Sequence, residues 1–381
     1  MLRASPRSPR RTTCLTATAE GHAGAGLRLT IDLEALARNW QALAARAAPA
    51  ECAAAVKADG YGLGIEQVVP SLLQAGCRTF FVALPAEGCR VRAVAADAAI
   101  YVLNGVFPEA IGMYRDHRLL PVINTLADAR MWAEQSHGLG SAIHVDTGMN
   151  RLGLALPQAV ALADDHALIA ALRPQLLVSH LASADTPHNP LNGRQLHRFG
   201  EVRALFPHLP ASLANSAGIS LGRAFQCDLV RPGIGLYGGS PESVAPVVTA
   251  EARILQIRDI SPGDTVGYGG AGHVHRRSRV AILGAGYADG YLRAAGSSDG
   301  KHGGSAWLNG SRLPLLGRVS MDLIAVDVTD ASRAETGDWV ELFGPNMPLA
   351  EVAAAAGTIP YELLTGLSRR ASRRYLPLQE A

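Results

Sequence analysis

The sequence lacks the features that would tie it to a membrane or to a polyanionic partner. None of its apolar runs approaches the roughly 18 to 20 residues that a transmembrane helix needs. The formal net charge is only +2, so there is no excess of positive charge for nucleic acid. The chain has 381 residues, 48% of them hydrophobic, which indicates a globular protein with a large core and about two or three domains.

Cysteine is scarce and scattered along the chain. The five cysteines form no CxxC pair, and they are Cys14, Cys52, Cys77, Cys89 and Cys227. An odd number without such pairs favours reduced thiols over a disulfide framework or a zinc site. We therefore expect a cytoplasmic protein and no metal site.

Residues 1–26 show no hydrophobic periodicity. They mix Arg, Ser, Pro and Gly, as disordered segments do. The pair Arg10 and Arg11 is a weak indication of an export signal, but the following TTCLTATAEG is too short and too polar for the apolar core of one. We interpret the segment as a disordered N-terminal tail.

Residues 27–246 alternate between short apolar runs and helical patterns. The runs that end in polar or Gly residues are CAAAVK, TFFVAL, AIYVLN, LLPVIN, SAIHVD, QLLVSHLA, ASLANS and DLVRPGIGLYG. Eight such units over about 220 residues are typical of a (β/α)8 TIM-type barrel. A doubly wound parallel sheet is the alternative, because counting runs errs by a unit or two.

Residues 247–381 have a different texture. Strand-like runs such as RVAILGAGYADG and GDWVELFG are separated by Gly, Pro, Asn and Asp turns, and PLAEVAAAAG is helical. This pattern predicts a second, mostly β domain.

Lysine is rarer still, since the chain contains only Lys57 and Lys301. Lys57 ends a small apolar run in AAAVKADGYGLG. A strand-end lysine that reaches solvent is one interpretation, and a lysine kept for amine chemistry is the other.

Polar residues at the predicted strand ends bear on this choice, because barrel enzymes carry their sites at the carboxyl ends of the strands. The residues at those ends are Lys57, His144, Asp146, Arg151, His180, Asn215, Ser216, Arg231 and Gly233. Singly, such residues are more often loop caps than ligands. Together they offer an amine, a hydroxyl with free backbone N–H groups for a phosphate, and a fixed cation. Pyridoxal 5'-phosphate requires this combination, so the set favours amine chemistry at Lys57.

Nine motifs in order then resemble those of the alanine racemase family, over essentially the whole chain after the tail. They are AAAVKADGYGLG, HVDTGMNRLG, SHLASAD, LANSAG, VRPGIGLYGG, VGYGG, GYADGY, GRVSMD and IPYELLT. The resemblance implies a pyridoxal-phosphate enzyme that interconverts L-alanine and D-alanine, for peptidoglycan or for alanine catabolism. It also implies a homodimer whose active sites are shared between subunits.

The resemblance implies a role for each site residue. Lys57 would bind the cofactor covalently, Arg231 would contact the pyridine nitrogen, and His180 would lie against the ring. Arg151 would contact the phenolic oxygen or the substrate carboxylate. The phosphate would be surrounded by Tyr61, Ser216, Gly233, Ile234 and Tyr361, and Asn215 would also bind the cofactor. From the partner subunit, Tyr268 would act as the second base beside Lys57, and the backbone of Met321 would receive the carboxylate.

Racemisation removes a proton from one face of the α-carbon and returns it on the other, so two bases are the economical solution. Lysine and tyrosine ordinarily have pKa values near 10.4 and 10, and each needs a shift of about three units to act near neutrality. Desolvation lowers the pKa of a lysine, and neighbouring cations lower the pKa of either side chain.

One position departs from the family pattern. Many members have a carbamylated lysine where this chain has His144, and that anion holds the arginine that corresponds to Arg151. His144 either orients Arg151 through a hydrogen bond or simply packs at the strand end. We predict no lysine carbamylation here.

Rival functions remain at this stage. A basic amino-acid decarboxylase on the same architecture would need an acidic group at the pyridine nitrogen, which Arg231 opposes. A barrel that only stores the cofactor has no need of residues 247–381. A racemase of broader specificity stays open, because a few side chains at the entrance would set the substrate size.

Overall fold

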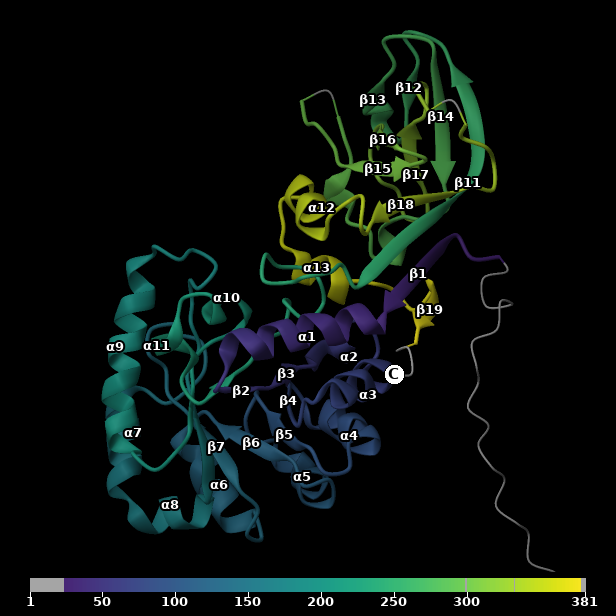
Figure 1. Cartoon of the computed structure of the whole chain (residues 1–381). Helices are drawn as coiled ribbons and strands as arrows, with labels where there is room; N and C mark the ends of the chain where they lie inside the picture. The colour runs from purple at the N-terminus through teal and green to yellow at the C-terminus, as the bar shows by residue number, and fades with distance from the viewer. Residues whose placement is uncertain (1–23, 299, 332, 378–381) are drawn as a thin grey trace, which may run out of the picture.

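The computed structural model describes residues 24–298, 300–331 and 333–377. The predicted tail at 1–26 therefore lies almost wholly outside the described residues. The described chain forms a barrel and a separate domain rich in antiparallel strands (Figure 1). No described helix is both long and apolar enough to cross a membrane.

The barrel sheet is parallel and its strands follow one another in chain order. They are β3 (Ala54–Ala55), β4 (Thr79–Val82), β5 (Ala99–Val102), β6 (Leu120–Ile123), β7 (Ser141–His144), β8 (Pro174–Val178) and β9 (Ala211–Ser212). Two further short strands, β2 (Glu51–Cys52) and β10 (Leu229–Val230), pair with each other. Backbone bonds from Ala55 to Pro232 and from Arg231 to Ala214, each 2.9 Å, close the ring.

The predicted TIM-type barrel is confirmed. Each of the eight apolar runs contains one of these strands, and strands such as β4 and β6 are buried along their whole length, as parallel strands covered by helices should be. The sequential strand order also excludes the doubly wound alternative, in which the order reverses at a switch point.

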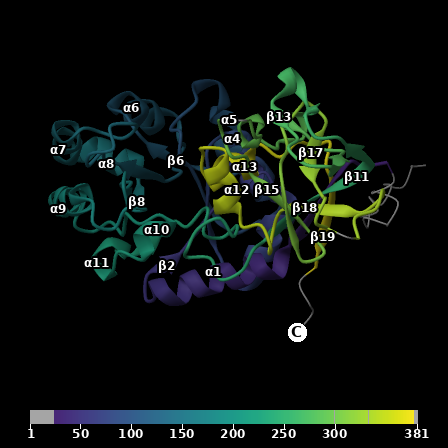
Figure 2. The same ribbon diagram turned by 90° about the horizontal axis from the view of Figure 1, so that it is seen from above.

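Helices surround the barrel (Figures 1 and 2). They are α1 (Leu33–Ala47), α3 (Ile65–Ala75), α4 (Pro85–Val94), α5 (Ile111–Asp116), α6 (Leu126–Gln135), α7 (Leu156–Asp164), α8 (His166–Leu172), α9 (Pro190–Leu205), α10 (Ser216–Ile219) and α11 (Arg223–Gln226). Helix α1 begins as its sequence predicts, because the carboxylate of Asp32 accepts a hydrogen bond from the N–H of Ala35 at 2.8 Å. Its residues Leu36 and Leu43 are fully buried.

The first strand, β1 (Leu27–Asp32), does not belong to the barrel sheet, although the sequence analysis placed it in the barrel segment 27–246. It pairs with β11 (Val248–Ile260) and β19 (Ser372–Leu376) of the other domain. The physical reason lies in its alternating burial, since one face of β1 is covered and the other is partly open. Such a strand suits a sheet with one covered face better than a barrel wall.

The second domain contains the predicted mostly β structure. Its other strands are β12 (Thr265–Val266), β13 (Gly272–His273), β14 (Ser278–Leu283), β15 (Ser305–Leu308), β16 (Ser311–Pro314), β17 (Ile324–Asp327) and β18 (Trp339–Phe343). Its helices are α12 (Leu349–Ala355) and α13 (Pro360–Thr365). Helix α13 returns to the barrel, where the ring of Tyr361 lies 6.0 Å from that of Tyr61.

Candidate active site

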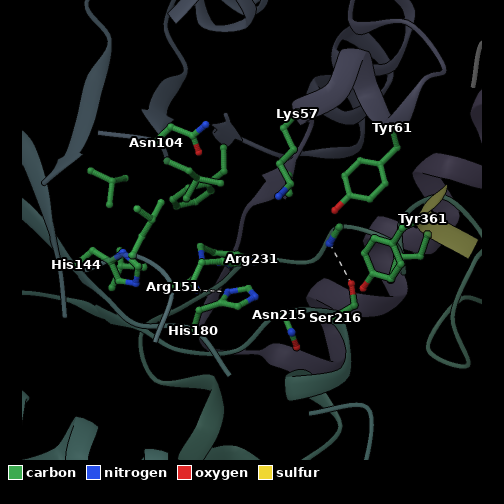
Figure 3. Close-up of a pocket in the computed structure, with 18 residues that line it drawn as sticks. Lys57, Tyr61, Asn104, His144, Arg151, His180, Asn215, Ser216, Arg231 and Tyr361 are labelled. Atoms are coloured by element: carbon green, nitrogen blue, oxygen red, sulfur yellow. Dashed lines mark hydrogen bonds between the residues drawn. The ribbon is translucent and has the colours of Figure 1, made fainter. Parts of the chain in front are cut away.

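A cavity of about 410 Å³ opens at the carboxyl ends of the barrel strands. The ten residues that the sequence analysis expected at the cofactor all line it: Lys57, Tyr61, Arg151, His180, Asn215, Ser216, Arg231, Gly233, Ile234 and Tyr361. In Figure 3 the amine of Lys57 points into the pocket, with Tyr61, Ser216 and Tyr361 on one side and His144 on the other. The pocket therefore has two chemically different ends.

Lys57 lies directly after β3, at the start of the short segment α2 (Lys57–Tyr61). This segment is a left-handed turn, because Ala58, Asp59 and Gly60 have φ values of 54°, 57° and 63°. The pKa of Lys57 is lowered, first by burial and then by the nearby charge of Arg151. A larger fraction of this amine is therefore neutral near pH 7 than of an exposed lysine.

Backbone and hydroxyl groups gather at the other side of the pocket. Ser216 begins α10, and its Oγ accepts hydrogen bonds from the N–H groups of Gly233 at 2.9 Å and Gly235 at 3.1 Å. A Cβ on Gly233 would lie 2.1 Å from the hydroxyl oxygen of Tyr61, so this close approach requires glycine. Asn215 caps α10 by accepting from the N–H of Gly218 at 2.9 Å.

Tyrosines enclose this end of the pocket. The ring of Tyr61 stacks on that of Tyr237 with centroids 4.5 Å apart, and Tyr237 donates to the backbone oxygen of Ala55 at 3.0 Å. Burial raises the pKa values of both Tyr61 and Tyr361. Their hydroxyls therefore stay protonated and remain hydrogen-bond donors.

Arg231 forms the buried floor of the pocket. Its guanidinium donates to the Oγ of Ser212, to the backbone oxygen of Ser179 at 2.5 Å, and to Nδ1 of His180 at 3.4 Å. Burial lowers its pKa to about 10, which leaves it charged at neutral pH. No carboxylate of the described residues pairs with it.

The contact with Arg231 determines which neutral tautomer His180 adopts. Since a guanidinium only donates, Nδ1 of His180 must accept, and its proton lies on Nε2. Burial and the charge of Arg231 both hold the pKa of His180 well below its ordinary value.

His144 ends β7 and is likewise neutral. Its Nδ1 lies 2.7 Å from Oδ1 of Asn124, whose amide nitrogen donates to the backbone oxygens of Leu103 and Val122. That assignment makes Nδ1 the donor and leaves Nε2 as an acceptor. Burial lowers the pKa of His144 to about 4, with a further contribution from Arg231.

Arg151 follows His144 on an exposed loop and forms no ion pair with any carboxylate of the described residues. The loop is shaped by Asp146, which accepts from the N–H groups of Gly148, Met149 and Asn150 at 2.8 to 2.9 Å. Asp146 therefore supports the loop and does not line the pocket.

Tyr268 and Met321 lie outside this pocket, and their side chains are 72% and 53% exposed. Tyr268 follows β12 in the β domain, which extends away from the barrel in Figure 1. The N–H of Met321 donates to no acceptor among the described residues, while its carbonyl accepts from Ala288 at 2.9 Å. Both residues are thus open to a ligand or to another chain.

Sequence reasoning missed several lining residues. Asn104 follows β5 and points toward the cavity, and its polar side chain at a strand end was an available signal (Figure 3). The apolar walls are Phe81, Leu103, Val122, Leu152 and Val178, which look like ordinary core residues in the sequence.

Comparison with known proteins identifies the family. The N-terminal domain of alanine racemase matches residues 31–241, and the C-terminal domain of alanine racemase matches residues 247–375. The chain belongs to the alanine racemase family. An alanine racemase from Methylobacterium nodulans is 49% identical over 362 residues, with 92% of this chain and 96% of the relative covered.

Other members of the alanine racemase family agree with this. A biosynthetic alanine racemase from Agrobacterium fabrum is 48% identical, with 92% of this chain and 94% of the relative covered. The crystal structure of alanine racemase from Bartonella henselae, with covalently bound pyridoxal phosphate, superposes with a TM-score of 0.87. It is 38% identical and covers 92% of this chain and 100% of that one.

The pocket of this family member fits pyridoxal phosphate on its own geometry. One lysine amine reaches the cavity, and a glycine whose missing Cβ makes room for the hydroxyl of Tyr61 lies beside hydroxyl and backbone donors. A cavity of about 410 Å³ also lies in the range of small-molecule sites.

Proposed function

We propose that this chain interconverts L-alanine and D-alanine with pyridoxal phosphate, in a pocket that a second copy of the chain completes. The observation that carries the proposal is the convergence of Lys57, Ser216 and Arg231 on one cavity at the strand ends. These three supply an amine, a hydrogen-bond donor for the phosphate and a fixed cation. The membership of the family gives the substrate.

Lys57 offers the amine that holds the cofactor covalently. When bound, pyridoxal phosphate withdraws electrons from the α-carbon of an amino acid and so acidifies its hydrogen. Lys57 then serves as the base on one face of that carbon. The lowered pKa of its amine supports this role, because the base must be neutral to accept a proton.

The phosphate end is formed by Ser216, Gly233 and Ile234, together with Tyr61 and Tyr361. The Oγ of Ser216 already accepts two backbone hydrogen bonds, so its own proton is free to be donated to an anion. The two tyrosine hydroxyls are protonated donors. Asn215 keeps the start of α10 in place behind them.

Arg231 sets the electronic character of the site. Arg231 is a buried cation with no carboxylate partner among the described residues, so it would disfavour a proton on the pyridine nitrogen of the cofactor that it would contact. This limits the electron-withdrawing power of the site to what a brief proton transfer needs. It opposes the decarboxylase alternative, which requires an acidic group at that position.

The second base is Tyr268 of a partner subunit. The pocket tyrosines Tyr61 and Tyr361 stay protonated near neutral pH, because burial raises their pKa values, so neither hydroxyl is available to accept a proton. Tyr268 is 72% exposed and therefore available to a neighbouring chain. The unpaired N–H of Met321 and the guanidinium of Arg151 are the groups that would bind the substrate carboxylate.

This arrangement implies a homodimer in which the β domain of each chain lies over the barrel opening of the other chain. Each chain supplies one half of each site, so two-fold symmetry completes both sites at once. We place the dimer in the cytoplasm, where it would supply D-alanine for peptidoglycan or serve the catabolism of alanine.

The test is an assay with each enantiomer of alanine in turn, in the presence of pyridoxal phosphate. A racemase brings both reactions to the same mixture of equal amounts, because enantiomers have equal free energies. Release of carbon dioxide from a basic amino acid such as lysine, in a parallel assay, would instead identify a decarboxylase. Cofactor binding without turnover would identify a storage protein.

A further inference from the structure

The backbone that follows Lys57 is in an unusual conformation. Ala58, Asp59 and Tyr61 have φ values of 54°, 57° and 54°, and Gly60 between them has 63°. Residues with a Cβ rarely adopt this left-handed region, and consecutive ones do so only when their surroundings hold them there. A group outside the turn must therefore stabilise it.

Glu87 is that group. On α4, its Oε1 accepts hydrogen bonds from the N–H of Ala58 at 2.6 Å and of Asp59 at 3.4 Å. Its Oε2 accepts from the N–H of Ala83 at 2.9 Å and of Leu84 at 3.2 Å, which caps the start of α4. One carboxylate thus joins the end of β4, the start of α4 and the first residues after Lys57.

The same face of α4 holds the turn a second time. Arg90, three residues after Glu87, donates to Oδ1 of Asp59 at 2.6 Å and to the carboxylate of Glu66 at 2.6 and 2.7 Å. Oδ1 of Asp59 also accepts from the N–H of Ile65 at the start of α3. The turn is therefore bound to two helices.

We propose that Glu87 is a positioning residue, which fixes the left-handed turn and thereby directs the amine of Lys57 into the pocket. The hydrogen bond from Ala58 acts on the peptide group directly after Lys57, so a change there reorients the lysine itself. This inference rests on the proposed role of Lys57.

Glu87 also acts on Lys57 through its charge. The charged groups that shift the pKa of Lys57 are Arg151, which lowers it, and Glu87, which raises it. Removal of the Glu87 charge leaves burial and Arg151 unopposed. The pKa of Lys57 should then fall further, which an indirect effect on stability would not cause.

The experiment compares Glu87→Gln with Glu66→Gln. Gln keeps the size of Glu87 but replaces one carboxylate oxygen with an NH2 group. That group cannot accept a hydrogen bond, so the backbone N–H groups on that side lose their acceptor. Glu66→Gln is the matched control, because it weakens an ion pair of the same Arg90 but leaves the hydrogen bonds from Glu87 and from Arg90 to the turn in place. For Glu87→Gln we expect kcat to fall by roughly ten- to a hundredfold with KM for alanine little changed. For the control we expect less than about a twofold change.

A second readout does not depend on the loaded enzyme. Because the chain contains only Lys57 and Lys301, 13C-labelled lysine gives two resolvable side-chain signals, which Lys301→Arg assigns. Titration of the full-length chain without cofactor should give a lower pKa for Lys57 in Glu87→Gln than in the wild type. Glu66→Gln should leave the pKa of Lys57 where it is in the wild type.

A second substitution, Ala58→Gly, tests whether the conformation of the turn is what Glu87→Gln disturbs. Glycine adopts the left-handed region without steric cost, so Ala58→Gly should restore part of kcat to Glu87→Gln. Glu87→Asp, with a shorter carboxylate, covers the case that Glu87→Gln does not fold, and it should lower kcat in the same way. Wild-type kcat in either Glu87 variant, or rescue of thermal stability by Ala58→Gly without rescue of kcat, would overturn the positioning role. Failure of the wild type to bind cofactor at Lys57 would instead overturn the proposed function.

Discussion

The barrel and the β domain differ in whether the fold of a single chain brings their candidate site residues together. In the barrel, residues as distant in sequence as Lys57 and Arg231 meet in one cavity, and Tyr361 joins them from α13. In the β domain, Tyr268 and Met321 lie exposed and do not line the barrel cavity of their own chain. A motif therefore identifies a residue's chemistry, but only the topology, or the assembly, decides which site it serves.

Among the residues that the barrel brings together, Lys57 should cause the largest loss of activity when it is replaced. Lys57→Ala removes both the covalent link to the cofactor and one base, so we expect racemisation to fall by about 10⁴-fold or more. Lys301→Ala is the control, because Lys301 is the only other lysine and lies in an exposed loop of the β domain. Mass spectrometry after chemical reduction should find cofactor on Lys57, and cofactor on Lys301 would refute the assignment.

Tyr268→Phe should affect chemistry without affecting the folded chain. It removes one hydroxyl from a side chain that is 72% exposed, so we expect a melting temperature close to that of the wild type. The loss of a base should lower kcat by about 10²- to 10⁴-fold. Cofactor absorbance and affinity should not change, and a wild-type kcat in Tyr268→Phe would show that Tyr268 is not one of the two bases.

Ser216→Ala should weaken the phosphate end by a smaller factor. It removes a donor to the phosphate and the acceptor of two backbone N–H groups. A loss of about 1 to 2 kcal/mol, or roughly five- to thirtyfold in the Kd of the cofactor, is expected from fluorescence titration. Ser220→Ala, at the other end of α10, removes only a surface contact with Arg46 and should leave the Kd unchanged.

The smallest of the predicted effects is on the free energy of unfolding, which should change little near neutral pH and decrease only in acid. The pKa of His144 in the folded state is about 4, below the 6.5 of the unfolded state, so the unfolded chain binds the proton first. Stability should thus be complete above pH 6.5 and should decrease as the pH falls towards 4, by at most about 3 kcal/mol. In urea unfolding, His144→Gln should reduce this slope, and His180 should account for what remains. An unchanged slope would show that His144 is accessible to protons in the folded state.

The sequence predicts the barrel well because its parallel strands are covered on both faces, which makes each one a short continuous apolar run. The pocket residues are predictable for a related reason. The carboxyl ends of parallel strands meet on one side of a barrel, so polar residues that follow the runs must come together there.

Other features depend on contacts that local pattern does not contain. The place of β1 in the second sheet is decided by pairing with β11 and β19, more than 200 residues away. The left-handed turn after Lys57 depends on Glu87, and the apolar walls at Phe81 and Val122 resemble any buried strand residue. No local signal in the sequence marks these as parts of a site.

We propose that Tyr268 of the other subunit completes each pocket. The most direct measurement mixes a Lys57→Ala chain with a Tyr268→Phe chain, each inactive alone, and follows racemisation after subunit exchange. In the heterodimer one of the two sites contains both bases, so the account predicts about half of the wild-type activity per heterodimer. If Tyr268 served the pocket of its own chain, both heterodimer sites would lack a base. The absence of any recovered activity in verified heterodimers would contradict the account.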